Sequence, residues 1–103
     1  MHIAPFDNQN KPIVDVDNAC VPLNYFNIVK LKKGDAFEYR IPGYETCIVP
    51  ATGTVDVDVS GATFDKIGNR TIDVWDGEPE GVYVPVDTAA QMVCASDEAE
   101  VFI

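Results

Sequence analysis

The sequence predicts an all-β protein, either a sandwich or a barrel of short strands. Turn-forming Gly and Pro residues recur at short intervals along the 103 residues, and several of the segments between them alternate apolar and polar side chains. No window of helical length repeats its apolar residues every 3.6 positions. A chain of this length is expected to form one domain around a single core.

An amino-terminal arm precedes the predicted barrel. Residues 1–22 carry few strand signals, so we predict that they form an arm that wraps a neighbouring subunit, while residues 23–103 form the single β-barrel domain. The first two strands of that domain are expected at residues 25–31 and 36–41. A turn at Gly34 separates them, because glycine supplies the positive φ that a tight turn needs.

The middle of the chain shows the clearest alternation. Residues 54–59 place three valines on one face and two aspartates on the other, which is typical of a strand with one buried face. A strand is expected before it at residues 45–50, and Ser60-Gly61 predicts a turn after it. The remaining predicted strands lie at residues 72–75, 82–86, 90–95 and 100–103.

The charge excludes some classes of partner. Seventeen acidic residues against seven Lys and Arg give a net charge of −10, which repels nucleic acid and disfavours anionic membranes. No apolar run approaches the ~20 residues that cross a bilayer. The first residues do not resemble a signal peptide, so we expect a cytoplasmic protein. A group of carboxylates in one Gly- and Pro-rich loop matches no EF-hand spacing, and we interpret it as solvated: Asp73, Asp76, Glu78 and Glu80.

The cysteines predict neither a disulfide scaffold nor a zinc site. Cys20, Cys47 and Cys94 are odd in number and widely spaced, and no C-x-x-C pair occurs. Cys47 and Cys94 lie in apolar, strand-like segments, so we expect both to be buried, inert thiols.

Five short stretches of the chain share one recognisable layout. They are Gly43-Tyr44-Glu45-Thr46-Cys47, Gly53-Thr54-Val55-Asp56-Val57, Gly68-Asn69-Arg70, Trp75-Asp76-Gly77-Glu78-Pro79 and Val82-Tyr83-Val84-Pro85. With the frame formed by Gly34, Glu45 and Gly53, they resemble the amino-terminal domain of the 5-deoxy-glucuronate isomerase family, which includes the 5-keto-4-deoxyuronate isomerases. The resemblance covers residues 25–103 and implies a cupin-type double-stranded β-helix, that is, a jelly-roll barrel. Between Gly68 and Trp75 the chain is one residue longer than the family pattern.

The resemblance also implies an activity and a division of labour. Family members are two-cupin enzymes of inositol and pectin-sugar breakdown that interconvert the aldehyde and keto forms of a sugar acid, with the metal in the second domain. The generic cupin frame would place metal ligands near Arg40, Pro42, Glu45 and Ala90, which cannot supply the set of His and carboxylate ligands that a divalent metal requires. The only histidine, His2, is far from this frame in sequence. We therefore expect no metal, no cofactor and no catalytic residue in this chain.

Four residues are candidates for lining a ligand pocket: Arg40, Glu45, Trp75 and Tyr83. Glu45 has two interpretations. One is a general base or an acceptor for sugar hydroxyls, and the other is a structural carboxylate that pairs with Arg40 or Arg70 or caps a turn, which we favour. The two aromatic side chains either stack on a sugar ring or pack in the core or an interface, and we favour packing. Alternation places Tyr83 on the opposite face of its strand from the neighbouring valines.

Two functions remain open from the sequence. In the first, the domain belongs to a sugar-acid isomerase and contributes packing, subunit contacts or part of the pocket wall, with a sugar acid as the ligand. In the second, it is a stand-alone metal-free cupin that binds a small molecule or a protein. A homodimer or higher oligomer is expected in either case, because the strand edges of a small sandwich need cover.

Overall fold

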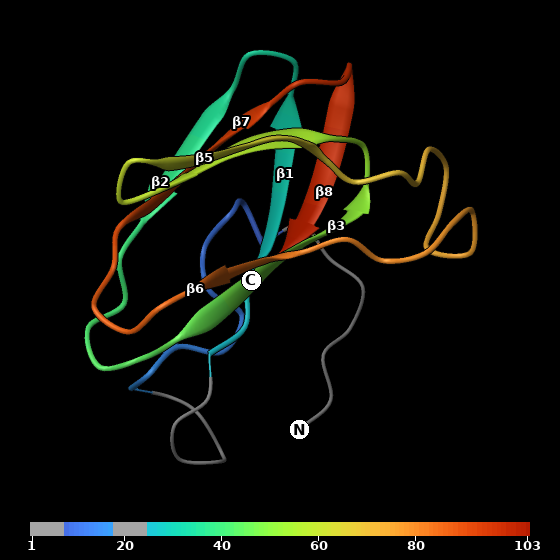
Figure 1. Ribbon diagram of the computed structural model, residues 1–103. Helices are drawn as coiled ribbons and strands as arrows, with labels where there is room; N and C mark the ends of the chain where they lie inside the picture. Colours follow the sequence, from blue (N-terminus) through green and yellow to red (C-terminus); the bar gives the residue numbers. More distant parts are fainter. Residues whose placement is uncertain (1–7, 18–24) are drawn as a thin grey trace.

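The computed structural model describes residues 8–17 and 25–103, and this part of the chain contains eight strands and no helix. The strands are β1 (Ile28–Lys32), β2 (Ala36–Tyr39), β3 (Thr46–Thr52), β4 (Val55–Val59), β5 (Ala62–Ile67), β6 (Val82–Val84), β7 (Ala90–Cys94) and β8 (Glu98–Phe102). They form two antiparallel four-stranded sheets that face each other, in the orders β1-β8-β3-β6 and β2-β7-β4-β5 (Figure 1). These orders are those of an eight-stranded jelly roll, which confirms the predicted fold class.

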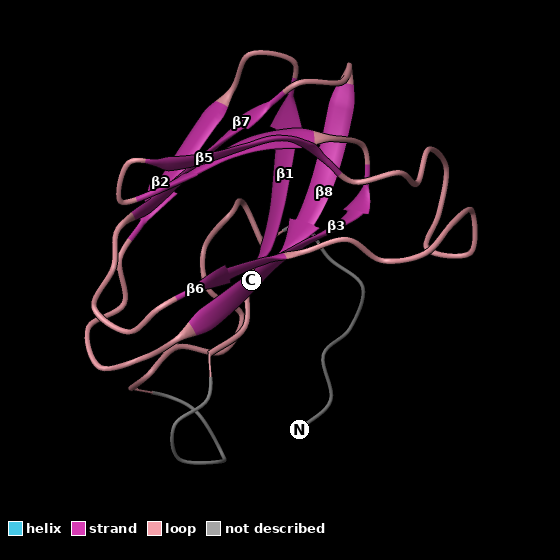
Figure 2. Cartoon of the chain, in the orientation of Figure 1, coloured by secondary structure: helices cyan, strands magenta, loops and turns pink. Residues whose placement is uncertain are grey.

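The core lies between the two sheets and is almost entirely aliphatic. In most strands alternate residues point inward, as in β4, where Val55, Val57 and Val59 are buried and the aspartates between them lie on the outer face. Strands from both sheets of Figure 2 contribute to one buried cluster: Val29, Leu31, Ile48, Val55, Val57, Val59, Val82, Val84, Ala90, Met92, Cys94, Ala99, Val101 and Ile103.

The outer faces of the two sheets differ in character. Across the β2-β7-β4 sheet the register aligns Glu38, Gln91 and Asp58 in one polar row. The outer face of the other sheet carries a tilted pair of rings, Phe26 and Phe102, with centroids 6.0 Å apart. The three residues of this polar row line one side of the candidate site.

One predicted strand was wrong, and one observed strand was not predicted. Residues 72–75 form turns and bends rather than a strand, because nearby carboxylates accept their backbone N–H groups. Strand β5 was not predicted, since all its residues except Ile67 are exposed and no apolar face marks it. The other predicted strands exist, with ends that shift by up to three residues.

Part of the predicted arm packs against its own domain. The side-chain amide of Asn10 bonds to the backbone of β1 in the way that a neighbouring strand would. Its Nδ2 donates to the carbonyl of Lys30 (3.1 Å), and its Oδ1 accepts the Lys30 N–H (2.7 Å). Asn27, which is fully buried, donates to the carbonyl of Asn10 (3.1 Å) and accepts from the Asn8 side chain (2.9 Å). Residues 8–17 therefore cover the edge of β1, which protects its unpaired backbone groups.

Gly53 holds the end of β3 close to β8. Its φ is +76°, and a Cβ at this position would overlap the backbone of Glu98 and Ala99. A glycine is thus required at position 53 because the turn after β3 approaches the backbone of β8 closely. The Gly53 N–H also donates to the carbonyl of Arg70 at 2.7 Å, which fixes the start of the long β5–β6 connection.

The prediction that both strand cysteines are buried is half correct. Cys94 is buried, and burial is the main reason that its thiol pKa is raised, as expected for an inert thiol. Cys47 is exposed, because it occupies an outward-facing position of β3, opposite Tyr83 of β6. Cys20 and His2 lie outside the described residues.

Candidate functional site

The interior of the barrel is packed with aliphatic side chains together with Met92 and the buried thiol of Cys94. Ile48, Met92 and Val55 are completely buried there, and the one buried polar residue of the described chain is Asn27. The positions of the cupin frame do not converge, because Arg40, Pro42 and Glu45 are exposed while Ala90 lies in the core. Within the described ranges, no group of three or more His, Cys, Asp or Glu residues is arranged to hold a metal ion.

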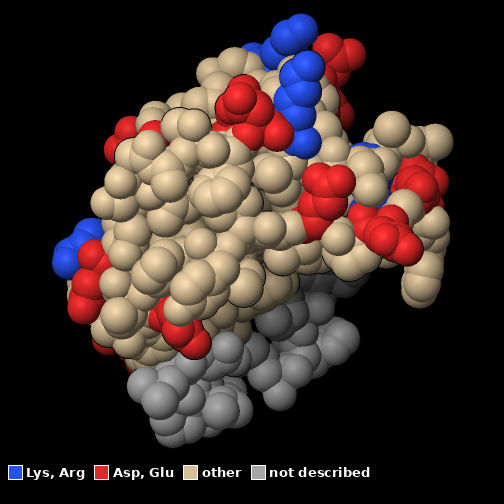
Figure 3. Space-filling view, in the orientation of Figure 1, with Lys and Arg blue, Asp and Glu red and all other residues tan. Residues whose placement is uncertain are grey.

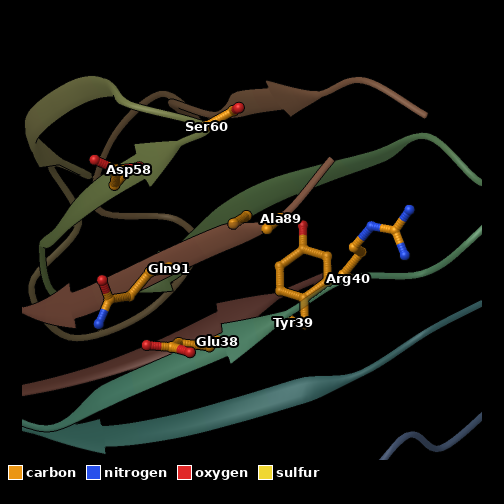
Figure 4. A pocket seen from close by; sticks show the side chains of 8 residues that line it. Glu38, Tyr39, Arg40, Asp58, Ser60, Ala89 and Gln91 are labelled. Carbon is orange, nitrogen blue, oxygen red and sulfur yellow. The ribbon is translucent and has the colours of Figure 1, made fainter. Parts of the chain in front are cut away.

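An open hollow of about 500 Å³ lies on the outer side of the β2-β7-β4 sheet, towards the end formed by the turns after β2 and β4. Figure 4 shows side chains that line it. They come from the end of β2, the end of β4 and the start of β7: Glu38, Tyr39, Arg40, Asp58, Ser60, Ala89, Ala90 and Gln91.

Strand register brings the polar side chains of the hollow together. Glu38 and Asp58 are the two cross-strand neighbours of Gln91, so one amide lies between two carboxylates. Asp58 also accepts the Gly61 N–H (3.0 Å), which fixes the turn after β4. Because this row depends on pairings between distant segments, sequence reasoning identified none of these three side chains as a site residue.

Arg40 is held at the rim by the loop before β7. Its Nε donates to the carbonyl of Asp87 (3.2 Å), and the Asp87 carboxylate accepts the Gly43 N–H (2.6 Å). In Figure 4 the Arg40 guanidinium points away from Glu38 and Gln91. The hollow thus has a cationic side and a carboxylate side.

Tyr39 lies next to Glu38 at the hollow, and it is half-buried and packs against the core. Its hydroxyl is bonded to Thr46 Oγ1 (2.6 Å), and burial is the main reason that its pKa is raised to about 12. The surrounding groups both donate and accept hydrogen bonds, which suits a small, hydroxyl-rich molecule.

Glu45 and Tyr83, two of the predicted site residues, are bonded to each other outside this hollow. The Tyr83 hydroxyl donates to Glu45 Oε2 at 2.6 Å, and this bond is the main cause of the raised pKa of Tyr83. Both side chains are exposed on the outer side of the barrel. Glu45 therefore has a hydrogen-bond partner, and that partner is a tyrosine and not Arg40 or Arg70.

Trp75, the fourth predicted residue, lies far from the other three. It belongs to the β5–β6 connection, which projects on the opposite side of the molecule from the turns around the hollow (Figure 1). Its side chain is 90% exposed. Carboxylates gather on this projecting part in Figure 3.

The described part of the chain, residues 8–17 and 25–103, has no helix with the length and apolar character needed to cross a bilayer.

Comparisons with known proteins identify related sequences and one related structure. The model of the KduI/IolB family matches residues 2–103. The 5-deoxy-glucuronate isomerase of Bacillus subtilis (strain 168) is 30% identical over 93 residues, which are 87% of this chain and 34% of that protein. The protein of the same name from Listeria monocytogenes serotype 4a (strain HCC23) is 28% identical over 92 residues, 86% of this chain and 33% of its own length.

A solved structure has the same fold. The crystal structure of an IolB-like protein from Salmonella typhimurium LT2 matches with a TM-score of 0.66 and 28% identity, over 76% of this chain and 30% of that one. The chain thus spans about a third of the length of the relatives that it matches.

Proposed function

This chain belongs to the KduI/IolB family, and we propose that it serves as the metal-free cupin unit of a sugar-acid isomerase of the 5-deoxy-glucuronate type. In this role it supports the fold and the assembly of the enzyme and does not carry the proton transfer itself. The setting that we propose is sugar-acid and inositol catabolism in the cytoplasm.

The packed interior of the barrel is the observation that supports this proposal. Isomerisation of an aldose to a ketose needs a base that moves a proton between adjacent carbons, and a metal or another electrophile that polarises the carbonyl. The residues of the buried cluster are aliphatic except for Met92 and Cys94, and none of them is a carboxylate, a histidine or a cation. This domain therefore offers the substrate no ionisable base and no metal-binding group of the His and carboxylate type in its core.

The first test is an activity assay of the purified chain. We expect no conversion of 5-deoxy-glucuronate, either alone or with added Mn²⁺, Zn²⁺ or Fe²⁺, and no retention of these metals after gel filtration. Turnover by the purified chain, lost on chelation and restored by one metal, would contradict the proposal.

The mass of the natural gene product separates the two settings for this unit. A mass well above 11.3 kDa places it within a longer isomerase, whereas a mass that matches this chain indicates an independent module.

A second candidate function is ligand binding by an independent module, which the hollow beside Arg40 favours. A guanidinium at one side and hydrogen-bonding carboxylates at the other match a sugar acid, whose carboxylate and hydroxyls require both. We expect sugar acids to raise the unfolding temperature more than neutral sugars or nucleosides do. The variant Arg40→Gln should lose this gain, while Lys33→Gln, an exposed cation in the β1–β2 turn, should keep it.

A further inference from the structure

One peptide bond of the β5–β6 connection is prone to rearrange. We call residues 69–78 of this connection the projecting loop. Near its end lies Asp76-Gly77, the only Asp-Gly pair of the chain, and no Asn-Gly pair occurs. In such a pair no Cβ hinders the glycine nitrogen when it approaches the carboxyl carbon of the aspartate, so a five-membered succinimide ring forms readily. Asp76 is exposed on a loop that projects from the molecule (Figure 1), so water reaches this bond.

The packing of the loop favours a glycine after Asp76. A Cβ on Gly77 would lie 2.8 Å from the side-chain oxygen of Asn69, so a larger residue would have to displace that side chain. The Gly77 carbonyl also accepts a hydrogen bond from Arg70 Nε at 2.9 Å, which joins the two ends of the loop. The fold therefore has a structural reason to keep this pair, although the pair is chemically labile.

The carboxylate of Asp76 is held by the residues that precede it. Its Oδ2 accepts the N–H of Ile72 (2.6 Å), the N–H of Asp73 (3.2 Å) and the hydroxyl of Thr71 (3.1 Å). The bonds from the two N–H groups are the main reasons that the pKa of Asp76 is lowered. The backbone N–H of Asp76 donates in turn to the carbonyl of Asp73 (3.2 Å). These bonds fix the orientation of the carboxylate and keep it ionised.

The rearrangement needs no reactant other than water. The Gly77 nitrogen bonds to Cγ of Asp76, and the carboxyl hydroxyl leaves with the amide proton as water. Water then opens the ring at one of its two carbonyl carbons. Opening at Cγ restores aspartate, whereas opening at the backbone carbonyl carbon breaks its bond to nitrogen and leaves the chain connected through Cβ and Cγ, as an isoaspartate.

The bonds of the loop oppose the first step. Ring closure requires a protonated carboxyl group that turns towards the nitrogen of the following residue. All three donors to the Asp76 carboxylate lie earlier in the chain, and each of them favours the ionised form. The carboxyl group becomes free to react only when the loop opens, which is a local unfolding event.

We propose that Asp76 is a site of isoaspartate formation in this protein, and that its bonds to residues 71–73 hold the reaction back while the projecting loop is closed. An isoaspartate lengthens the backbone by one carbon and moves the carboxylate, so the same bonds cannot form again. The modified loop therefore stays open, and we expect proteases to cleave it faster than the unmodified loop.

The first experiment compares the folded and the unfolded chain. The purified protein is incubated in warm, neutral buffer with or without guanidinium chloride, and trypsin then releases residues 71–103 as one peptide, because no Lys or Arg follows Arg70. Electron-transfer fragmentation of this peptide distinguishes isoaspartate at position 76 from isoaspartate at its other aspartates. In the unfolded chain we expect position 76 to react fastest, and in the folded chain we expect the reaction there to be about tenfold slower or more.

A matched pair of variants tests the hold of the loop. Thr71→Val removes one donor to the Asp76 carboxylate, and we expect isoaspartate to form several-fold faster in the folded protein. Thr63→Val, at an exposed position of β5, should leave the rate unchanged. Both side chains are exposed, so circular dichroism should show that each variant remains folded.

Two kinds of result overturn the proposal. If the unfolded chain forms no more isoaspartate at position 76 than at its other aspartates, the assigned site is wrong. If the folded and unfolded chains react equally fast, or if Thr71→Val reacts no faster than Thr63→Val, the loop does not hold the reaction back. Neither result depends on isomerase activity or on ligand binding at the hollow beside Arg40, so the proposals can fail separately.

Discussion

Tyr39 links the packing beside the hollow to the response of the protein to alkali. Because its pKa is raised to about 12 by burial, the folded protein keeps this hydroxyl neutral at a pH where the unfolded chain, with an ordinary pKa of 10.0, has released the proton. The contribution of Tyr39 to the stability of the fold is therefore complete below pH 10 and is lost as the pH rises towards 12. We expect Tyr39→Phe to reduce the fall in stability across this range, as measured by urea unfolding at a series of pH values.

At neutral pH, Tyr39→Phe should lower the free energy of unfolding by about 1 kcal/mol, because the hydrogen bond to Thr46 disappears. Tyr44→Phe, in the loop between β2 and β3, is the matched control. An unchanged alkaline transition in Tyr39→Phe would show that other groups control it.

At the scale of single residues, sequence reasoning identified side chains more readily than it identified their partners. It selected Arg40, which lies at the hollow, and the pair of Glu45 and Tyr83, but it did not connect that pair. Glu38 and Gln91 were missed because their proximity follows from the pairing of β2 with β7, two strands from opposite halves of the chain. The five short stretches that carried the family resemblance do not state which residues of distant strands lie opposite one another.

At the scale of elements, the attachment of residues 8–17 depends on one buried amide. Asn27→Ala removes a fully buried side chain that bonds to both Asn8 and Asn10, so the half-buried polar groups of those two residues each lose a partner. We expect a loss of about 2–3 kcal/mol in the free energy of unfolding, measured by equilibrium urea denaturation. Asn10→Ala, which removes bonds near the exposed surface, should lose about 1 kcal/mol. Equal losses would mean that the buried amide has no special role.

The alternating strands were predictable, and those without alternation were not. The three valines of β4 define a buried face, and this is a local property of the sequence. Strand β5 has no such face, because it is an edge strand whose side chains are mostly exposed. A bulge interrupts its pairing with β4, and there the Asp56 carboxylate, in place of a backbone carbonyl, accepts the Lys66 N–H (2.8 Å). For residues 72–75 a strand was predicted and none is present. The apolar side chains that suggested it are exposed on the connection between β5 and β6.

At the scale of the whole molecule, the net charge of −10 should make stability depend on salt. Like charges repel one another more strongly in the compact state than in the unfolded chain, and added ions screen this repulsion. We expect NaCl to raise the unfolding temperature by a few degrees, with each 1 kcal/mol corresponding to roughly 4–8 °C for a domain of this size. The double variant Glu38→Gln with Asp65→Asn, which removes two exposed carboxylates, should show a smaller gain, as followed by circular dichroism.

The strand order also determines when the sheets can form during synthesis. Strand β8 lies between β1 and β3, so the first strand of the described residues pairs with the eighth, which leaves the ribosome after the other seven. The β2-β7-β4-β5 sheet can assemble as soon as β7 has emerged, whereas β1 must wait with its apolar face uncovered. Loss of the last few residues would therefore separate β1 from β3, and a truncated chain would expose the inner face of that sheet to chaperones and proteases.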